Sequence, residues 1–231
     1  MDGRLVRVSK SLSWLLRHGA GEAGVSMDRE GYVPVSEVLG LKQFKDVSLG
    51  DLLCVVENNS KKRFEVAGEG AALRVRASQG HSRQVADRID HAALLTPITP
   101  DRVPSACVHG TYTQAWAAIQ REGLKRMGRQ HIHCTDSLTR QEGQAEISGF
   151  RASCDVMIHI DVARAMAAGV EFFRSANGVI LTEGHEGVLP PAFFANVTDR
   201  HGRELQWARP ETRDADPRGA GASLPRRRCV L

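Results

Sequence analysis

The sequence predicts an α+β protein of two lobes, the first of which is a small winged-helix lobe. Apolar residues recur at helical spacing in residues 5–16 and 49–57. Two short strands follow at residues 61–66 and 73–76, and the glycine-containing turn 68–70 joins them as a hairpin. Helices followed by a terminal hairpin are typical of a winged helix. The 231 residues are enough for two lobes that each bury a core.

The second lobe is predicted from short strands that alternate with short helices. Glycines follow several of these segments and mark their ends. We expect strands at residues 107–111, 156–161, 170–174 and 178–182, and helices at residues 112–122 and 162–168.

The boundaries of the lobes follow from composition. Residues 1–86 form the first lobe, and residues 87–104 form a linker that three prolines stiffen in its later part. Residues 105–200 form the second lobe. Residues 201–231 are rich in Arg, Pro, Gly and Ala and poor in aliphatic residues, which predicts a disordered basic tail.

Two cations end the first predicted helix. We expect Ser9 to cap its N-terminus and Gly19 to end it, just after Arg17 and His18. The dipole of a helix favours positive charge in its last turn by about 0.3–1 kcal/mol. The pair could therefore serve only the helix, or it could belong to a functional site. Ser48 is expected to cap the later helix that begins at Leu49.

Charge and cysteine content narrow the setting of the protein. Residues 1–86 carry 13 Lys/Arg against 10 Asp/Glu, residues 87–200 carry 11 against 13, and residues 201–231 carry 7 against 4. This basic excess permits nucleic-acid binding but does not establish it. Five scattered cysteines without a Cys-x-x-Cys pair predict reduced thiols in the cytoplasm or nucleus. No apolar run approaches the roughly 20 residues of a membrane span, so we expect no membrane partner.

The stretch from Met127 to Cys134 concentrates polar chemistry. It predicts a turn at Gly128 that leads into a strand, and strand alternation places Arg129, His131 and His133 on one face. Such a row needs a polar partner opposite it. With His109, the two histidines could form a three-histidine zinc site, although no carboxylate close in sequence would support them. No Walker loop, Gly-x-Gly-x-x-Gly or nucleophile elbow is present.

Six short stretches carry a family resemblance. They are Leu-Ser-Trp-Leu-Leu-Arg-His (12–18), Lys-Lys-Arg-Phe (61–64), Arg-Ala-Ser-Gln-Gly-His-Ser (76–82), Val-His-Gly-Thr (108–111), Met-Gly-Arg-Gln-His-Ile-His (127–133) and Phe-Arg-Ser-Ala-Asn-Gly-Val (173–179). Each is a weak pattern alone, but in this order they resemble the NAD-dependent RNA 2′-phosphotransferase family of tRNA splicing. The resemblance covers roughly residues 5–195. It implies a winged-helix RNA-binding lobe followed by an ADP-ribosyltransferase-like β-sheet lobe, with the active site between them.

The resemblance also implies the site residues. The catalytic set falls on Arg17, His18, Arg63 and Arg129. The residues for NAD, which is a co-substrate of the family, fall on His109, Gly110, Thr111, His133 and Asn177, and no metal is implied. Asn177 lies close to where poly(ADP-ribose) polymerases carry a catalytic glutamate. A carboxylate there would repel an incoming phosphate.

The reaction that the resemblance implies has two steps. An internal 2′-phosphate of RNA, for example of a tRNA, first attacks the nicotinamide ribose of NAD and expels nicotinamide. The ribose 2″-hydroxyl then attacks the phosphorus and releases 2′-OH RNA and ADP-ribose 1″,2″-cyclic phosphate. Arginines suit both steps because they stay charged and bind phosphate through paired N–H donors. The histidine of the set could act as an acid or as a base.

Two other functions stay open from the sequence. The first is an ADP-ribosyltransferase that caps terminal phosphates of RNA or DNA and stops after one step. The second is an RNA-binding module without catalysis. Because all four expected catalytic positions are occupied, the sequence argues against this second function. In each case we expect a monomer.

Overall fold

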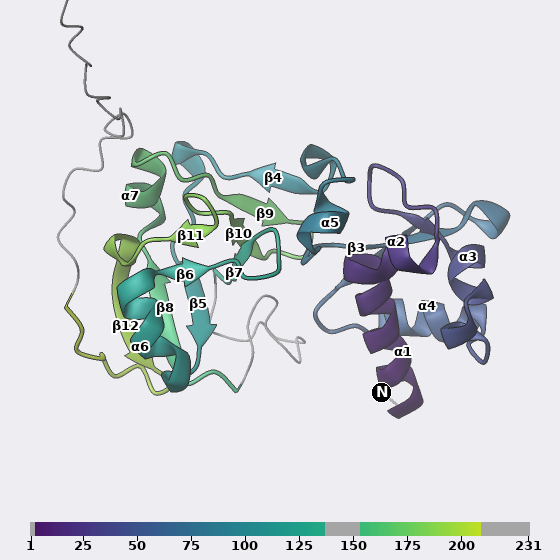
Figure 1. Ribbon diagram of the computed structural model, residues 1–231, viewed down its shortest axis with the longest axis horizontal. Coiled ribbons are helices and arrows are strands. Elements are labelled where there is room, and N and C mark those ends of the chain that lie inside the picture. The colour runs from purple at the N-terminus through teal and green to yellow at the C-terminus, as the bar shows by residue number, and fades with distance from the viewer. Residues whose placement is uncertain (1–2, 137–152, 209–231) are drawn as a thin grey trace, which may run out of the picture.

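The computed structural model describes residues 3–136 and 153–208, in which helices and short strands are mixed. The helices α1–α4 gather at one end of the molecule and the strands β5–β12 at the other (Figure 1). Most of the predicted disordered tail, from residue 209 onward, lies outside the described residues. No helix in the two described ranges is both long enough and apolar enough to cross a membrane.

The N-terminal lobe packs helices against a small antiparallel sheet of strand order β1-β3-β2. Register pairs Val66 with Val75 and Val33 with Val75, so Val75 lies at the centre. The elements are α1 (Gly3–Trp14), the π-helical turn η1 (Leu15–Gly19), α2 (Ala20–Ala23), β1 (Val33–Pro34), α3 (Val35–Gly40), η2 (Lys42–Phe44), α4 (Leu49–Glu57), β2 (Phe64–Ala67), η3 (Gly70–Ala72) and β3 (Arg74–Ala77).

The first helix is longer than the sequence predicts. It begins at Gly3, so the expectation that Ser9 caps its N-terminus is wrong. Gly19 does not end it either, because η1 passes directly into α2, and the helix stops at Gly24 with φ +68°. A π-helical turn is rare, occurs mostly as a single turn inside an α-helix, and is frequent at functional sites. Here it contains the Arg17-His18 pair, which therefore lies within the helix rather than at its end.

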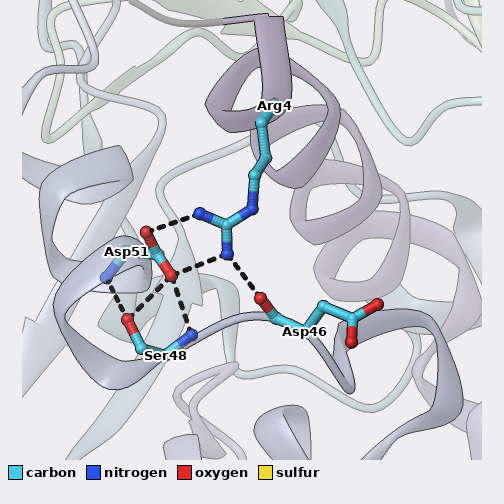
Figure 2. A network of polar contacts seen from close by, with 4 residues as sticks. All are labelled: Arg4, Asp46, Ser48 and Asp51. Atoms are coloured by element: carbon cyan, nitrogen blue, oxygen red, sulfur yellow. Dashed lines mark hydrogen bonds and ion pairs between the residues drawn. The ribbon is translucent and has the colours of Figure 1, made fainter.

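The start of α1 is fixed to the start of α4 by a polar network (Figure 2). Ser48 and Asp51 form a capping box, in which the Asp51 N–H donates to Ser48 Oγ and the Ser48 N–H donates to the Asp51 carboxylate. The predicted cap at Ser48 is confirmed. Arg4 donates from Nη1 and Nη2 to the same carboxylate at 3.1 and 3.0 Å, and it also donates to the carbonyl of Asp46.

The C-terminal lobe consists of short strands in three sheets. Their orders are β4-β9-β10-β7, β12-β8-β5 and β11-β6. The elements are β5 (Val108–Thr111), α6 (Thr113–Glu122), β6 (Leu124–Lys125), β7 (Ile132–Cys134), β8 (Val156–Ile160), α7 (Val162–Ala167), β9 (Phe173–Ser175), β10 (Ile180–Thr182), β11 (Val188–Leu189), η6 (Pro191–Phe193) and β12 (Phe194–Asp199).

Each lobe has its own buried core. In the N-terminal lobe, the side chains of Leu12, Leu15 and Leu16 are fully buried against the sheet. In the C-terminal lobe, Ile158 on β8 and Phe194 on β12 lie at the centre of a separate apolar cluster. The helices and strands that carry the polar stretches are therefore anchored from behind by apolar packing.

Residues 87–104, which the sequence predicts as a linker, take part in the folded structure. They include η4 (His91–Ala93), β4 (Leu95–Pro97) and η5 (Pro100–Arg102), and β4 pairs with β9 at the edge of a sheet. Together with α5 (Arg83–Ala86), this segment forms a third buried cluster that reaches β10. Met27 of the N-terminal lobe packs against that cluster, so the lobes share an apolar contact.

Candidate active site

Arg17 is a half-buried cation whose pKa reflects no acidic neighbour among the described residues. Its Nε and Nη2 atoms are inaccessible to solvent and have no hydrogen-bond partner among the described residues. Burial above all, and then the nearby charges of Arg129 and Arg63, lower the pKa of Arg17 to about 10. The guanidinium still carries its charge at neutral pH. Two further cations close to the unpartnered donors of Arg17 favour an anion that carries more than one charge.

The segment after β3 holds Arg17 in place. The N–H of Ser82 donates to the Arg17 carbonyl at 2.8 Å. Gly80 adopts φ +86°, and a Cβ there would lie 3.4 Å from both Cζ and Nε of Arg17. Glycine at this position lets the backbone run close along the guanidinium in a conformation that other residues rarely adopt.

Arg63 is oriented by a buried asparagine. The backbone N–H and the Nη1 of Arg63 both donate to Oδ1 of Asn59, at 3.3 and 3.1 Å. The Asn59 side chain is buried, and the Arg63 carbonyl accepts a bond from the N–H of Ser78. Both ends of the residue are therefore fixed just before β2 begins.

Arg129 lies in a loop that one carboxylate closes. Glu183, just after β10, accepts a bond from Nη1 of Arg126 at 2.9 Å and another from Nε2 of Gln130 at 2.5 Å. The Arg129 N–H donates to the Arg126 carbonyl at 3.2 Å, and Arg129 forms an antiparallel bridge with Ser82. The C-terminal lobe thus presents Arg129 directly beside the segment that holds Arg17.

His18 lies at the edge of this group and is exposed. Partial burial is the largest cause that lowers the pKa of His18, and the charges of Arg17 and Arg129 lower it further. The imidazole is therefore neutral at pH 7 in the free protein, and it can accept a proton there. A bound anion would offset the two cations and favour the imidazolium.

A cavity of about 570 Å³ opens beside these residues. It lies between the end of η1 and the loop before β7, and its lining consists of His18, His109, Lys125, Arg126, Met127, Gly128, Arg129, His131, Ile132 and His133. A larger cavity of about 640 Å³ lies elsewhere, between β9 and α7, with an almost wholly apolar lining that includes Ile98, Met166 and Phe172. The smaller cavity is the better candidate because it gathers the ionisable groups.

Two histidines line this cavity in fixed orientations. The buried His133 donates from Nε2 to Oε1 of Gln79 at 2.8 Å, which is a contact between the two lobes. Burial, followed by the charges of Arg129 and Arg17, holds the pKa of His133 well below its usual value. His109 donates from Nδ1 to the carbonyl of His133 at 2.8 Å. Both rings therefore present defined atoms to a ligand.

Comparison with known proteins decides the family. A sequence model described as RNA 2′-phosphotransferase, Tpt1 / KptA family, matches residues 3–184. The chain belongs to this family. It is 44% identical over 201 residues to tRNA 2′-phosphotransferase 1 of Danio rerio, which covers 85% of this chain and 86% of that protein.

Other relatives of the family agree. The human tRNA 2′-phosphotransferase 1 is 42% identical over 194 residues, or 83% of this chain and 74% of that protein. A probable RNA 2′-phosphotransferase of Rhizobium leguminosarum is 40% identical over 178 residues, or 76% of this chain and 88% of the relative.

Of the residues that the family resemblance implies for NAD, two line the cavity and three do not. His109 and His133 line it, whereas Gly110 and Thr111 continue β5 beside them, where Gly110 pairs with Met157 of β8. Asn177 lies at the contact between the lobes. Its Nδ2 donates to the Lys61 carbonyl at 2.8 Å, and its Oδ1 accepts a bond from Ser175.

The three-histidine zinc alternative finds no support in the described parts of the chain. No group of three His, Cys, Asp or Glu side chains in residues 3–136 and 153–208 could hold a metal ion. His131 instead packs edge-on against Phe173 and lies 3.8 Å from Glu183.

Sequence reasoning missed four supporting residues of this family site. Gln79 and Gly80 lie inside a stretch that carries the resemblance, so a signal for them was present. Asn59 and Glu183 had no sequence signal. The role of Asn59 depends on its contact with Arg63, and the role of Glu183 depends on its contact with Gln130, which is 53 residues away in sequence.

Proposed function

We propose that this protein removes an internal 2′-phosphate from RNA, such as a spliced tRNA, with NAD as co-substrate. The products are 2′-OH RNA, nicotinamide and ADP-ribose 1″,2″-cyclic phosphate. The observation that carries the proposal is the cluster of Arg17, Arg63 and Arg129, in which the buried donors of Arg17 have no partner among the described residues. Membership of the 2′-phosphotransferase family supports the same conclusion.

The arginines bind and orient the phosphate. Hydrogen bonds to charged groups contribute about 1.5–3 kcal/mol each, and three converging guanidiniums can stabilise the charge that develops on the phosphate oxygens. The phosphate is already an anion, so the first attack requires no general base. In the second step a proton leaves the ribose hydroxyl and another must reach the departing RNA oxygen. We assign His18 to this proton movement.

The cavity beside the arginines suits the co-substrate. Its volume of about 570 Å³ falls within the roughly 300–1,000 Å³ of small-molecule pockets. When bound, NAD supplies a labile bond between its ribose and nicotinamide. We assign His109 and His133 to the ribose, and the neighbouring Gly110 and Thr111 to the adjoining wall. Asn177 would act on NAD only if its bond to Lys61 opens.

The proposal also includes the roles of the two lobes, the oligomeric state and the cellular compartment. We propose that residues 1–86 are a winged-helix RNA lobe and residues 105–200 an ADP-ribosyltransferase-like lobe. The basic excess of residues 1–86 supports RNA binding there. We further propose that the protein acts as a monomer in the cytoplasm or nucleus, where its cysteines stay reduced.

One assay separates this function from the two alternatives. The protein is incubated with NAD and an oligoribonucleotide that carries one internal 2′-phosphate, and the products are resolved by chromatography. The proposal predicts 2′-OH RNA, nicotinamide and the cyclic phosphate. A stable RNA–ADP-ribose adduct would instead support a one-step ADP-ribosyltransferase, and binding without nicotinamide release would support a catalytically inactive RNA-binding module.

A further inference from the structure

We propose that one face of α1 and of the η1 turn that continues it is a track for the RNA strand next to the 2′-phosphate, and that Trp14 stacks on a nucleobase there. We call this face the α1 track and define it by Arg7, Lys10, Trp14 and His18. The inference rests on the proposed function and adds to it a subsite for a base.

The four residues of the α1 track lie on one side of the helix. They are three or four positions apart, so their side chains are neighbours on the helix surface, with Cβ atoms about 5–6 Å apart. All four are exposed. The last of them, His18, lines the candidate cavity. The α1 track therefore leads along the surface to the site of the phosphate.

The two cations of the α1 track, Arg7 and Lys10, are not paired with an acidic group within residues 3–136 and 153–208. The helix α1 contains no acidic residue, and neither Arg7 nor Lys10 forms an ion pair with any residue that the structure describes. Arg4, on another side of the same helix, is by contrast engaged by Asp51 (Figure 2). Exposed cations in a row attract the phosphates of a nucleic-acid strand and release its counterions.

Trp14 is placed as an aromatic platform. Its side chain is 42% exposed, whereas Trp116 and Trp207 pack against each other and the apolar core. The Trp14 ring rests on Gly19, because a Cβ at position 19 would overlap three carbons of the ring. A ring that is held in place and still open to solvent can stack on a base without losing much side-chain freedom.

The arrangement favours RNA over NAD as the occupant of the α1 track. Cations that alternate with an aromatic ring match a strand of phosphates and bases. His109 and His133, which we assign to NAD, belong to the other lobe. A contribution of Trp14 to NAD binding is therefore an outcome that would contradict the inference.

The test measures binding of a fluorescent single-stranded oligoribonucleotide with one internal 2′-phosphate, without NAD. Trp14→Ala should weaken binding about 5- to 150-fold, and Trp14→Phe should restore most of the loss. An oligonucleotide that lacks the bases flanking the phosphate should bind both Trp14→Ala and wild type equally. Arg7→Gln/Lys10→Gln should reduce the slope of log affinity against log salt by about 1.4, because two phosphate contacts are lost.

Matched variants on the same lobe provide the controls. Leu49→Ala removes an apolar side chain that is 45% exposed, and Lys42→Gln/Lys45→Gln removes two exposed cations off the α1 track. Neither should change the affinity or the salt slope. The inference would be overturned if Trp14→Ala bound the RNA with wild-type affinity, or if the control variants lost as much affinity as Trp14→Ala. A raised KM for NAD in Trp14→Ala would overturn it as well. If the wild-type protein failed to release nicotinamide, the proposed function would be contradicted. The binding measurements would still test the α1 track, because they are made without NAD.

Discussion

Among the single residues, Arg17 is the most unusual, because it is held close to two other positive charges. Burial first, and then the charges of Arg129 and Arg63, lower the pKa of Arg17, yet folding keeps the three arginines close together. Asn59 fixes Arg63, and a backbone glycine at position 80 allows close approach to Arg17. Cations this close repel one another, and we expect a bound phosphate to offset that repulsion.

The first prediction concerns Arg63. Arg63→Ala should slow the second step more than the first, by about 10- to 150-fold, because a charged hydrogen bond to the phosphate contributes about 1.5–3 kcal/mol. The RNA–ADP-ribose adduct should therefore accumulate in a time course with NAD and 2′-phosphorylated RNA. Arg74→Ala is the control, since Arg74 pairs with Asp28 on the outside of the sheet. Equal loss of both steps would contradict this division of roles.

The second prediction concerns the protonation of His18. Arg129→Ala should raise the pKa of His18 in the free protein, because one of the two cations that lower it is removed. Burial, the largest cause, remains, so the pKa should stay below its usual value. The measurement is an NMR titration of the imidazole C–H signals. His159 is an internal control, because its pKa is lowered by burial alone. An unchanged His18 titration would show that the lobes do not bring these residues together.

The family resemblance, and not residue types alone, is what marks out the expected catalytic set, and it does not mark the residues that support that set. Arg17, His18, Arg63 and Arg129 lie in motifs, and the structure brings the three arginines into mutual electrostatic contact. Asn59 and Glu183 gave no sequence signal, since a buried asparagine and a surface glutamate have no motif of their own. The Asn177 amide is hydrogen-bonded to the Lys61 carbonyl and the Ser175 hydroxyl, and its expected contact with NAD stays a prediction.

At the scale of elements, the loop between β6 and β7 decides where Arg129 points. Arg126 and Gln130 at its two ends are both bonded to Glu183, which follows β10. The third prediction is that Glu183→Ala lowers turnover about 10- to 100-fold, because a small displacement of Arg129 misaligns the phosphate.

The stability of this variant should change little. Glu183 is 44% exposed, and exposed ion pairs contribute only about 0–1 kcal/mol to the free energy of unfolding. Steady-state kinetics and a denaturant melt together separate the two effects. Asp101→Asn, which removes an exposed carboxylate 3.7 Å from Arg102, should alter neither. A loss of activity that simply follows a loss of stability would show that Glu183 has no positioning role.

The fourth prediction concerns the cap of α4. Bonds from Ser48 and then Arg4 lower the pKa of Asp51 to about 2. A pKa that is depressed on folding adds stability above the unfolded value near 3.9, and the added stability is lost as pH falls toward 2. Asp51→Asn should therefore lower the melting temperature at pH 6, and its difference from wild type should close between about pH 4 and pH 2. A difference that persists at pH 2 would contradict the ionic contribution.

Elements were predictable where their ends carry local signals. Ser48 alone predicted the start of α4 correctly, and the structure adds Asp51 as the second residue of a capping box. The first helix was misjudged at both ends. Gly19 has helical dihedrals inside a π-helical turn, and what sets its position is contact with Trp14. Likewise, nothing local shows that residues 95–97 pair with β9, so a strand was taken for part of a linker.

At the scale of the whole molecule, several contacts join the two lobes around the site. His133 bonds to Gln79, the Gln130 N–H donates to the His81 carbonyl, and Asn177 bonds to the Lys61 carbonyl. The periodicity of apolar residues in the sequence predicted a mixed helix-and-sheet fold. It did not predict which contacts join the two lobes. Contacts over long sequence separations depend on the finished fold, and only the family resemblance pointed to a site between the lobes.

The central claim is that cations from both lobes converge on one phosphate. The most direct measurement is the ratio of affinities for an oligoribonucleotide with and without its internal 2′-phosphate, taken for wild type and for Arg17→Ala, Arg63→Ala and Arg129→Ala. The account predicts that wild type prefers the phosphorylated strand and that each variant, from either lobe, loses most of this preference. An undiminished preference in Arg129→Ala, the variant of the C-terminal lobe, would contradict it.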